Sequence, residues 1–410
     1  MTKQNAISPA ANEGRLWNKD FVLNLLVAHL LLAGFFSLFM VVPEFIVSLG
    51  GQAWEIGVII ATFGLAGVIV RPLAGKWILK SGPKRVALLG ISLFVGSTVL
   101  YIPLPSEWWI VPVRMIQGVG LATAPVATST IVANLAPEAR RGEAMSYMGN
   151  FISIAQLYAP PLGYALFISY GFEIAFSAAA IFAVGALIIL SFLSDRNTRI
   201  NLPETSVRDS IEVSAPLISK AAIFPTFIFL TYAFTMAPVS TFLPFLVGEK
   251  NLPETFEIFG RIFRFNPGLY FTFLSATTMV TTLASGRIAD RFGRGAVIVP
   301  GLALVAGAMF VLSKVFSPTA FFCAACLHGV GYGLIYPGIN SLVIDRVPEK
   351  ERGSALATLQ QAWDVGASGG NFVLGPVTGA FGFASAFVIV GVGAVTGAVG
   401  YVAGSRGKRP

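Results

Sequence analysis

The sequence predicts an all-α integral membrane protein with twelve transmembrane helices in two pseudo-symmetric six-helix bundles. The composition argues against a soluble protein, because 55% of the 410 residues are hydrophobic and 12% are charged, whereas soluble domains carry about 25% charged residues. The mean hydropathy is +0.75. Apolar stretches long enough to cross a bilayer recur along the chain, and several motifs recur at one constant spacing.

About twelve apolar stretches have the ~20-residue length of a membrane helix and are separated by glycine, proline and charged turns. They centre near residues 33, 60, 93, 120, 155, 182, 235, 275, 305, 330, 367 and 392. Only helices and closed barrels satisfy their backbone hydrogen bonds inside a bilayer. Because the stretches are continuously apolar and do not alternate, each is predicted to be a helix.

The basic residues predict the orientation of these helices, because cytoplasmic loops are enriched in lysine and arginine. With a cytoplasmic N-terminus, 23 of the 28 basic residues, Arg71 among them, fall on the cytoplasmic side. Four fall on the opposite side, namely Lys250, Arg261, Arg264 and Lys314. The remaining one, Arg114, lies within a helix. We expect a multi-pass protein of the plasma or inner cell membrane with both termini cytoplasmic, whose +8 charge contacts anionic lipid and not nucleic acid.

The chain contains an internal repeat with an offset of 211 residues. GKWILKSGPKR at Gly75 corresponds to GRIADRFGRGA at Gly286, and QGVG at Gln117 corresponds to HGVG at His328. The same spacing relates Pro137-Glu138 to Pro348-Glu349 and Arg141-Gly142 to Arg352-Gly353. These matches predict two six-helix halves, 1–195 and 222–410, joined by a cytoplasmic linker at 196–221. Parallel halves of this kind are a transporter architecture with the substrate site between them.

The repeated turns resemble the loop between helices 2 and 3 of the major facilitator superfamily, which reads roughly G-x-x-x-D-R-x-G-R-R. The second copy matches it at Gly286, Asp290, Arg291, Gly293 and Arg294. The first copy keeps Gly75, Gly82 and Arg85 but has Leu79 in place of the aspartate. In that family the loop latches the cytoplasmic side shut, so these residues are predicted to gate transport. The alternative is that they only set the topology.

Arg114 is a permanent charge inside a predicted span, where a charge costs about 2.5–3.5 kcal/mol on insertion scales. With Gln117 and Gly118 it resembles the R-x-x-Q-G pattern in the fourth helix of twelve-helix drug–proton antiporters of the superfamily. That resemblance implies a role for Arg114 in proton coupling. The alternative is an arginine that hydrogen-bonds backbone carbonyls and holds helices together.

Asp364 is the only acid deep within a predicted span. It belongs to a polar stripe whose steps of three and four place its members on one helix face: Gln360, Gln361, Asp364, Ser368 and Asn371. Burial favours a protonated carboxyl group, and a nearby arginine favours the ionised form. A carboxyl group that moves between two such environments can carry a proton. The alternative is a structural ion pair.

Other polar side chains share inward faces of their helices. His29 and Glu44 lie on helix 1, Gln156 on helix 5, and a stripe from His328 runs along helix 10. The predicted proton-coupling residues are Asp364, Arg114, Glu44 and His328. The predicted substrate-binding residues are Gln117, His29, Gln156, Tyr232, Tyr332, Tyr336, Asn340, Gln360, Gln361 and Asn371. Such a lining of amides, hydroxyls and aromatic rings suits a neutral or amphiphilic substrate.

Two further segments carry expectations of their own. Cys323 and Cys326 form a CxxC in an apolar helix, and small-residue packing is favoured over redox or metal chemistry. The segment from Glu249 to Phe265 is amphipathic and aromatic, so we expect it on the outer membrane surface; a plain extension of helix 7 is the alternative.

We expect a secondary active transporter that moves a small organic molecule by alternating access, most simply by proton-coupled efflux. A diluted antiporter motif in helix 5, which includes Ala159, Pro160 and Gly163, favours export. An uptake symporter or facilitator, a lipid or lysolipid flippase, and a non-transporting receptor remain alternatives. No metal or other cofactor and no enzymatic activity are expected, because no nucleophile–base or metal constellation occurs. The expected partners are the substrate, protons and membrane lipids, and the expected state is a monomer.

Overall fold

The computed structural model describes residues 16–102, 104–194, 222–258, 260–347 and 352–406. Within these ranges, nine helical segments are long and apolar enough to cross a membrane. They are α1 (Lys19–Ser37) with α2 (Val41–Ser48), α3 (Ala53–Ser81), α5 (Ile110–Leu135), α6 (Arg141–Tyr170), α7 (Phe172–Ser191), α10 (Ile223–Thr241), α13 (Gly295–Ser313), α14 (Pro318–Arg346) and α17 (Phe383–Arg406).

Three more helical segments complete the twelve predicted spans. They are α4 (Pro83–Val99), α12 (Leu269–Phe292) and a segment in which α15 (Arg352–Asp364) continues through the π-helical turn η6 (Val365–Gly369) into α16 (Gly370–Phe381). α4 is 17 residues long, and α12 is charged towards its end. The predicted all-α membrane class is confirmed.

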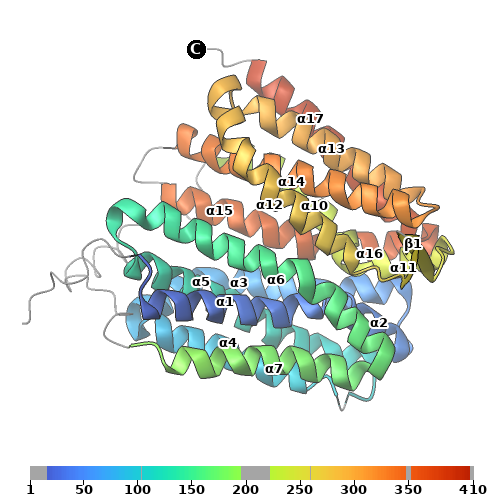
Figure 1. Cartoon of the computed structure of the whole chain (residues 1–410), viewed down its shortest axis with the longest axis horizontal. Helices are drawn as coiled ribbons and strands as arrows, with labels where there is room; N and C mark the ends of the chain where they lie inside the picture. Colours follow the sequence, from blue (N-terminus) through green and yellow to red (C-terminus); the bar gives the residue numbers. More distant parts are fainter. Residues whose placement is uncertain (1–15, 103, 195–221, 259, 348–351, 407–410) are drawn as a thin grey trace, which may run out of the picture.

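The helices pack as two groups (Figure 1). In the N-half, α1 packs on α6 and α7, and α5 packs on α3 and α4. In the C-half, α14 packs on α12 and α13, and α17 packs on α13 and α10. The predicted linker at 196–221 falls on 195–221, which lies outside the described residues.

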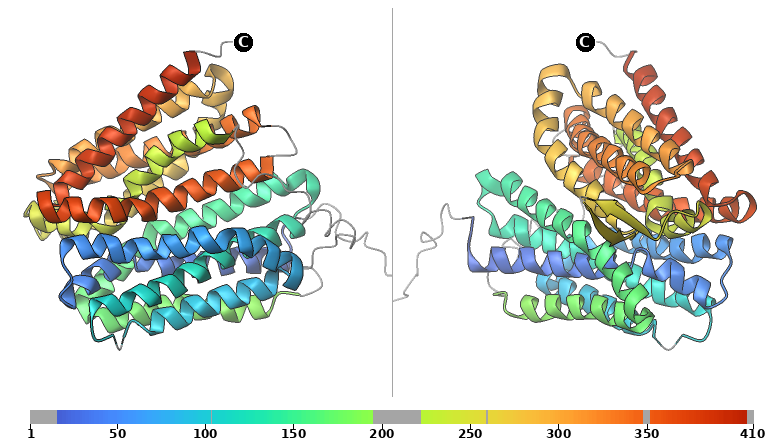
Figure 2. Two further views of the ribbon diagram at one scale, coloured as in Figure 1. Left: turned by 180° about the vertical axis from the view of Figure 1, so that it is seen from behind. Right: turned by 45° about the vertical axis from the view of Figure 1, so that its right-hand side comes forward.

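The two halves meet at one end of the molecule and diverge at the other (Figures 1 and 2). We call the first the hairpin end, because it carries strands β1 (Thr255–Ile258) and β2 (Arg261–Arg264). We call the second the basic end, because α3 turns into α4 there and α12 into α13, next to Lys84 and Arg294. The interface therefore closes one end of the space between the halves.

Small residues allow the closure at the hairpin end. α3 packs on α16, and a Cβ added at Gly375 would lie 2.6 Å from the backbone oxygen of Trp54 and 3.0 Å from the Cα of Gly57. On the other side α6 packs on α12, where the side-chain amide of Asn266 donates to the Pro161 carbonyl at 2.8 Å. The hydroxyl of Thr272 donates to the Leu157 carbonyl at 2.7 Å. Both contacts join residues of opposite halves.

Gly375→Leu is expected to prevent closure at the hairpin end, because its side chain has no space between the two backbones. We expect at least about a tenfold loss of transport, since a strain of 1.4 kcal/mol or more shifts a two-state equilibrium tenfold. The control is Gly96→Leu on α4, where an added Cβ meets no atom within 4 Å. Equal transport by both variants, measured in proteoliposomes, would contradict the assignment of this contact to closure.

The segment 249–265 differs from its expected form. A short helix, α11 (Leu243–Glu249), ends at Glu249, and the chain then forms an antiparallel hairpin with Thr255 opposite Arg264. The alternative of a longer helix 7 is therefore wrong beyond Glu249. Asn251, with φ 49°, and Pro253 interrupt the helix, and Gly260, with φ 72°, forms the turn between the strands.

Candidate functional site

A cavity of about 350 Å³ lies between the halves and is lined by both. Aromatic and aliphatic side chains form much of its wall. Its polar members come from α3, α5, α6, α10, α14, α15, η6 and α16: Arg71, Arg114, Gln156, Tyr232, Ser240, Thr241, Tyr332, Gln360, Asp364, Ser368 and Asn371. Seven residues predicted as site residues are among the lining: Arg114, Gln156, Tyr232, Tyr332, Gln360, Asp364 and Asn371.

Asp364 forms an ion pair with Arg71 across the two halves. The Nη2 of Arg71 on α3 donates to Oδ1 of Asp364 on α15 at 2.9 Å, and Nε lies 2.7 Å from Oδ2. The two side chains are 21% and 12% exposed, so the pair is largely withdrawn from solvent. One charge-assisted hydrogen bond therefore joins the pair, while Nε and Oδ2 are close without a hydrogen bond between them.

The placement of Arg71 corrects its assignment to a cytoplasmic turn. It lies ten residues before the end of α3 at Ser81, about 15 Å along a helix that rises 1.5 Å per residue. The turn itself forms later, at Gly82. Arg71 was placed outside the membrane because it follows an apolar stretch that is already long enough to span. The helix continues past this stretch, since α3 has 29 residues, more than a bilayer requires. Asp364 is the sequence feature that could have indicated a buried Arg71, because a buried acid needs a basic partner.

The turn η6 follows Asp364 directly and was not predicted from the sequence. It packs closely on α10, where a Cβ at Gly366 would lie 2.5 Å from the Cβ of Ala233. Such π-helical turns are frequent at functional sites. Three glycines in this segment, Gly366, Gly369 and Gly370, could have indicated an irregular helix from the sequence.

Arg114 lies on the N-half side of the cavity and is 7% exposed. Its Nη1 donates to Oε1 of Gln117 at 2.8 Å, and the hydroxyl of Tyr101 donates to the same oxygen at 3.2 Å. Its guanidinium carbon lies 5.1 Å from the centroid of the Phe63 ring. Within the described residues no carboxylate pairs with Arg114. The cavity therefore holds two arginines and one aspartate, a formal charge of +1.

Aromatic side chains form the C-half wall of the cavity. The rings of Tyr232 and Tyr332 stack with centroids 4.9 Å apart, and Trp363 lies 6.0 Å from each. Behind Tyr232 lies the fully buried His328, whose Nδ1 is 3.0 Å from the hydroxyl of Tyr270. His328 does not line the cavity, and neither do Tyr336 or Asn340, which follow it along α14.

The remaining predicted site residues also lie outside the cavity lining. The Nδ1 of His29 is 2.8 Å from the Phe151 carbonyl and must donate to it, so Nε2 accepts from the Tyr158 hydroxyl at 3.0 Å. These bonds join α1 to α6 within the N-half. Glu44 lies half-buried on α2. Gln361 is half-buried and is not part of the cavity lining, and Gln117 bonds Arg114 from outside the lining.

The model of the Major Facilitator Superfamily matches residues 25–264 and 262–410 of the chain. The chain belongs to the major facilitator superfamily. It is a secondary transporter of the membrane and not an enzyme. Members of this superfamily bind small molecules and often couple their movement to protons.

Two similar proteins are named for multidrug resistance, and one of them is named as an efflux pump. The chain is 25% identical over 344 residues to Multidrug resistance protein 1 of Bacillus subtilis, covering 82% of this chain and 84% of that protein. It is 24% identical over 363 residues to the multi-drug resistance efflux pump PmrA homolog of Lactococcus lactis, covering 86% and 87%. A crystal structure of a POT family transporter with a thioalcohol-conjugated peptide superposes with a TM-score of 0.77 over 94% of this chain and 96% of that chain, at 15% identity. The superposition shows a shared fold.

The two copies of the superfamily loop differ in their contacts. Gly82 and Gly293 have φ values of 82° and 86°, which glycine adopts without strain, and each ends its helix. In the second copy Arg294 donates to Asp290 at 2.6 Å and to Asp345 at 2.9 Å, and these bonds raise the pKa of Arg294. All three residues belong to the C-half.

The first copy contacts its own half as well. The ammonium group of Lys84 donates to the Leu193 carbonyl at 2.5 Å, and Leu79 leaves this copy without the aspartate that Arg294 bonds in the second. Arg85 is exposed, and an added Cβ at Gly75, Gly82, Gly286 or Gly293 meets no atom within 4 Å. The residues predicted to gate transport thus lie around the open basic end, away from the contacts that join the halves.

Proposed function

We propose that this transporter exports a small neutral or amphiphilic organic molecule in exchange for protons, and that Asp364 carries the proton. The observation that carries the proposal is the ion pair between Asp364 and Arg71, which joins the two halves at the wall of the cavity. Protonation of Asp364 removes the charge that attracts Arg71. The proton therefore controls a contact between the halves, which is lost while Asp364 is protonated and can form again when the proton is released.

The lining of the cavity supports an organic substrate of low charge. The stacked rings of Tyr232 and Tyr332 offer a flat apolar surface, and amides and hydroxyls offer hydrogen bonds beside it. The single excess charge comes from Arg114, which has no acidic partner among the described residues. The similarity to a multidrug resistance protein and to a multi-drug resistance efflux pump favours export over uptake.

The proposed cycle uses the two ends of the molecule. With the basic end in the cytoplasm, as the basic residues predict, the conformation with contacts at the hairpin end is open to the cytoplasm. A substrate enters the cavity from that side while Asp364 is ionised. After the halves rearrange, substrate leaves and Asp364 takes up a proton from outside. The protonated carrier returns and releases the proton in the cytoplasm.

The direction of proton movement tests this proposal. Everted membrane vesicles are energised, and a pH-sensitive dye reports proton movement as amphiphilic compounds of varied structure are added. Antiport predicts that an exported compound releases protons from the acidified lumen. Proton uptake together with the compound would instead establish symport. A lack of response across a broad panel, with compound still moving, would establish an uncoupled carrier.

A further inference from the structure

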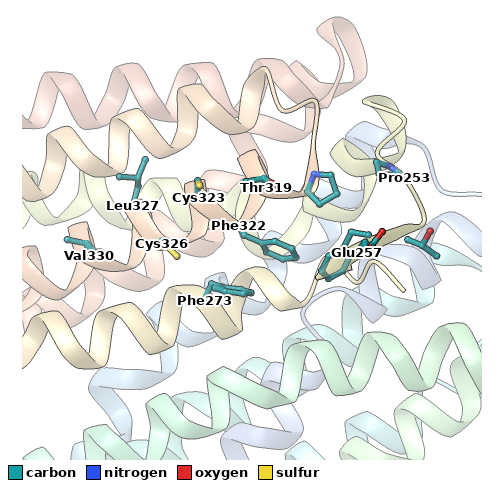
Figure 3. A pocket seen from close by; sticks show the side chains of 12 residues that line it. Pro253, Glu257, Phe273, Thr319, Phe322, Cys323, Cys326, Leu327 and Val330 are labelled. Carbon is teal, nitrogen blue, oxygen red and sulfur yellow. The ribbon is translucent and has the colours of Figure 1, made fainter. Parts of the chain in front are cut away.

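A second cavity of about 880 Å³ lies on the outer surface of the C-half, separate from the central one. It is a groove between α12, α14 and the hairpin (Figure 3). Phe273, Phe322 and Phe256 bound it, and Cys323, Cys326 and Val330 form much of its floor. The groove and the central cavity share no lining residue, so the groove is not an entrance to the transport site.

The groove exists because α12 and α14 touch near Gly333 and stand further apart towards the hairpin end. A Cβ at Gly333 would lie 2.8 Å from the Cβ of Thr281, so the helices touch there. The hydroxyl of Thr278 also donates across the contact to the Gly329 carbonyl at 3.0 Å. Towards the hairpin end the rings of Phe273 and Phe322, 4.7 Å apart, replace the glycine contact and separate the helices.

Within the part of the chain that the structure describes, the face of α14 that lines the groove is only partly covered. Thr319, Cys323, Cys326 and Val330 follow steps of three and four, so they share one face. Cys323 is exposed and Cys326 is half-buried, and both are free thiols. The expectation that this CxxC packs between helices is therefore wrong for Cys323. In a membrane protein such a face at hydrocarbon depth must be covered by something apolar.

We propose that the groove binds one acyl chain of a phospholipid. From Thr319 to Val330 the groove follows α14 for eleven residue steps, about 16 Å at 1.5 Å per residue. This equals roughly half of the ~30 Å hydrocarbon core, which is the depth of one leaflet. A chain that enters at the hairpin therefore ends near the bilayer centre, where Gly329 and Gly333 close the groove.

The hairpin at the mouth of the groove suits a zwitterionic head group. Glu257 lines the groove, and Glu254 and Arg264 line a neighbouring pocket. The strand of Glu257 pairs with β2, which carries the exposed Arg261 and Arg264, so acidic and basic groups lie on one hairpin. A phosphate and an ammonium in one head group can each meet an opposite charge there. The hydroxyls of Thr255 and Thr319 lie at the same rim. We therefore assign the groove to phosphatidylethanolamine, and this assignment does not depend on the proposed function.

Photocrosslinking in proteoliposomes tests the site. The full-length protein is reconstituted with a phosphatidylethanolamine that carries a diazirine on its acyl chain, irradiated, and digested for mass spectrometry. We expect adducts concentrated on residues 318–330 and on the hairpin. Val330→Trp and Cys326→Trp fill the groove and are expected to lose most of these adducts. The control, Ile181→Trp, changes a 70% exposed side chain on α7 and is expected to keep them.

Adducts spread evenly over all membrane-facing helices, unaffected by the groove-filling variants, would mean a general lipid annulus and overturn the proposal. A phosphatidylglycerol analogue that labels the groove more strongly would overturn the head-group assignment.

The two native thiols provide a second measurement without any substitution, because they are the only cysteines of the chain. In a steroid-based detergent, whose rigid rings fit an acyl-chain groove poorly, a lipid-soluble maleimide is expected to label Cys323 and Cys326. Added phosphatidylethanolamine is expected to slow the labelling. A labelling rate that is independent of added lipid would overturn the proposal.

Discussion

Asp364→Asn is expected to abolish compound-dependent proton movement while the protein remains folded in the membrane. Asparagine keeps the size of the side chain but cannot bind and release a proton. It also leaves Arg71 without the carboxylate that lies 2.7 Å from its Nε. Removing one partner of a buried ion pair costs roughly 3–5 kcal/mol. With side chains 21% and 12% exposed, this pair should fall towards the lower end of that range.

The double variant separates coupling from stability. Arg71→Gln alone leaves Asp364 unpaired, whereas Arg71→Gln with Asp364→Asn removes both charges together. We expect the double variant to have a higher Tm in detergent than either single variant, and to remain uncoupled. The matched control is Glu143→Gln, which breaks an exposed arginine–glutamate pair with Arg140 and should change neither property. Undiminished coupling in Asp364→Asn would return the ion pair to a purely structural role.

Arg114→Gln is expected to reduce transport at least about tenfold, which corresponds to a loss of 1.4 kcal/mol or more. Arg114 supplies the excess positive charge of the cavity, and the nearby Phe63 ring and Gln117 amide hold it in place. We propose that the fixed charge of Arg114 balances a negative charge in the cavity, such as that of the ionised Asp364, while Asp364 is separated from Arg71. Initial rates of transport in proteoliposomes over a range of compound concentrations would measure the loss.

The conservative variant Arg114→Lys tests whether charge or hydrogen bonding matters. Lysine keeps the charge but loses the planar group that bonds Gln117 and stacks on Phe63. If charge is the contribution of Arg114, Arg114→Lys should transport better than Arg114→Gln. Equal losses in the two variants would show that the hydrogen-bonded geometry with Gln117 is what transport requires.

Composition and periodicity predicted most of the fold, because membrane helices depend on local properties of the chain. In the residues that the structure describes, a helical segment occupies each predicted span, nine of them long and apolar enough to cross a membrane. Asp364 and Arg114 line one cavity as expected. Their apolar surroundings in the sequence already made both residues conspicuous. The stripes on helices 1 and 10 were less informative, since His29 and His328 bond tyrosines and a carbonyl within their own halves.

The helical class, the repeat, and the burial of Asp364 and Arg114 within spans follow from the amino-acid order alone. Each can be seen by comparing segments of the chain without knowing how the helices pack. The partner of Asp364 cannot be seen in this way, because Arg71 lies 293 residues away and meets it only through the packing of α3 on η6 and α15. The groove at Cys323 likewise depends on how far α12 stands from α14. Such distances are set by side chains on two different helices, so tertiary packing decided them.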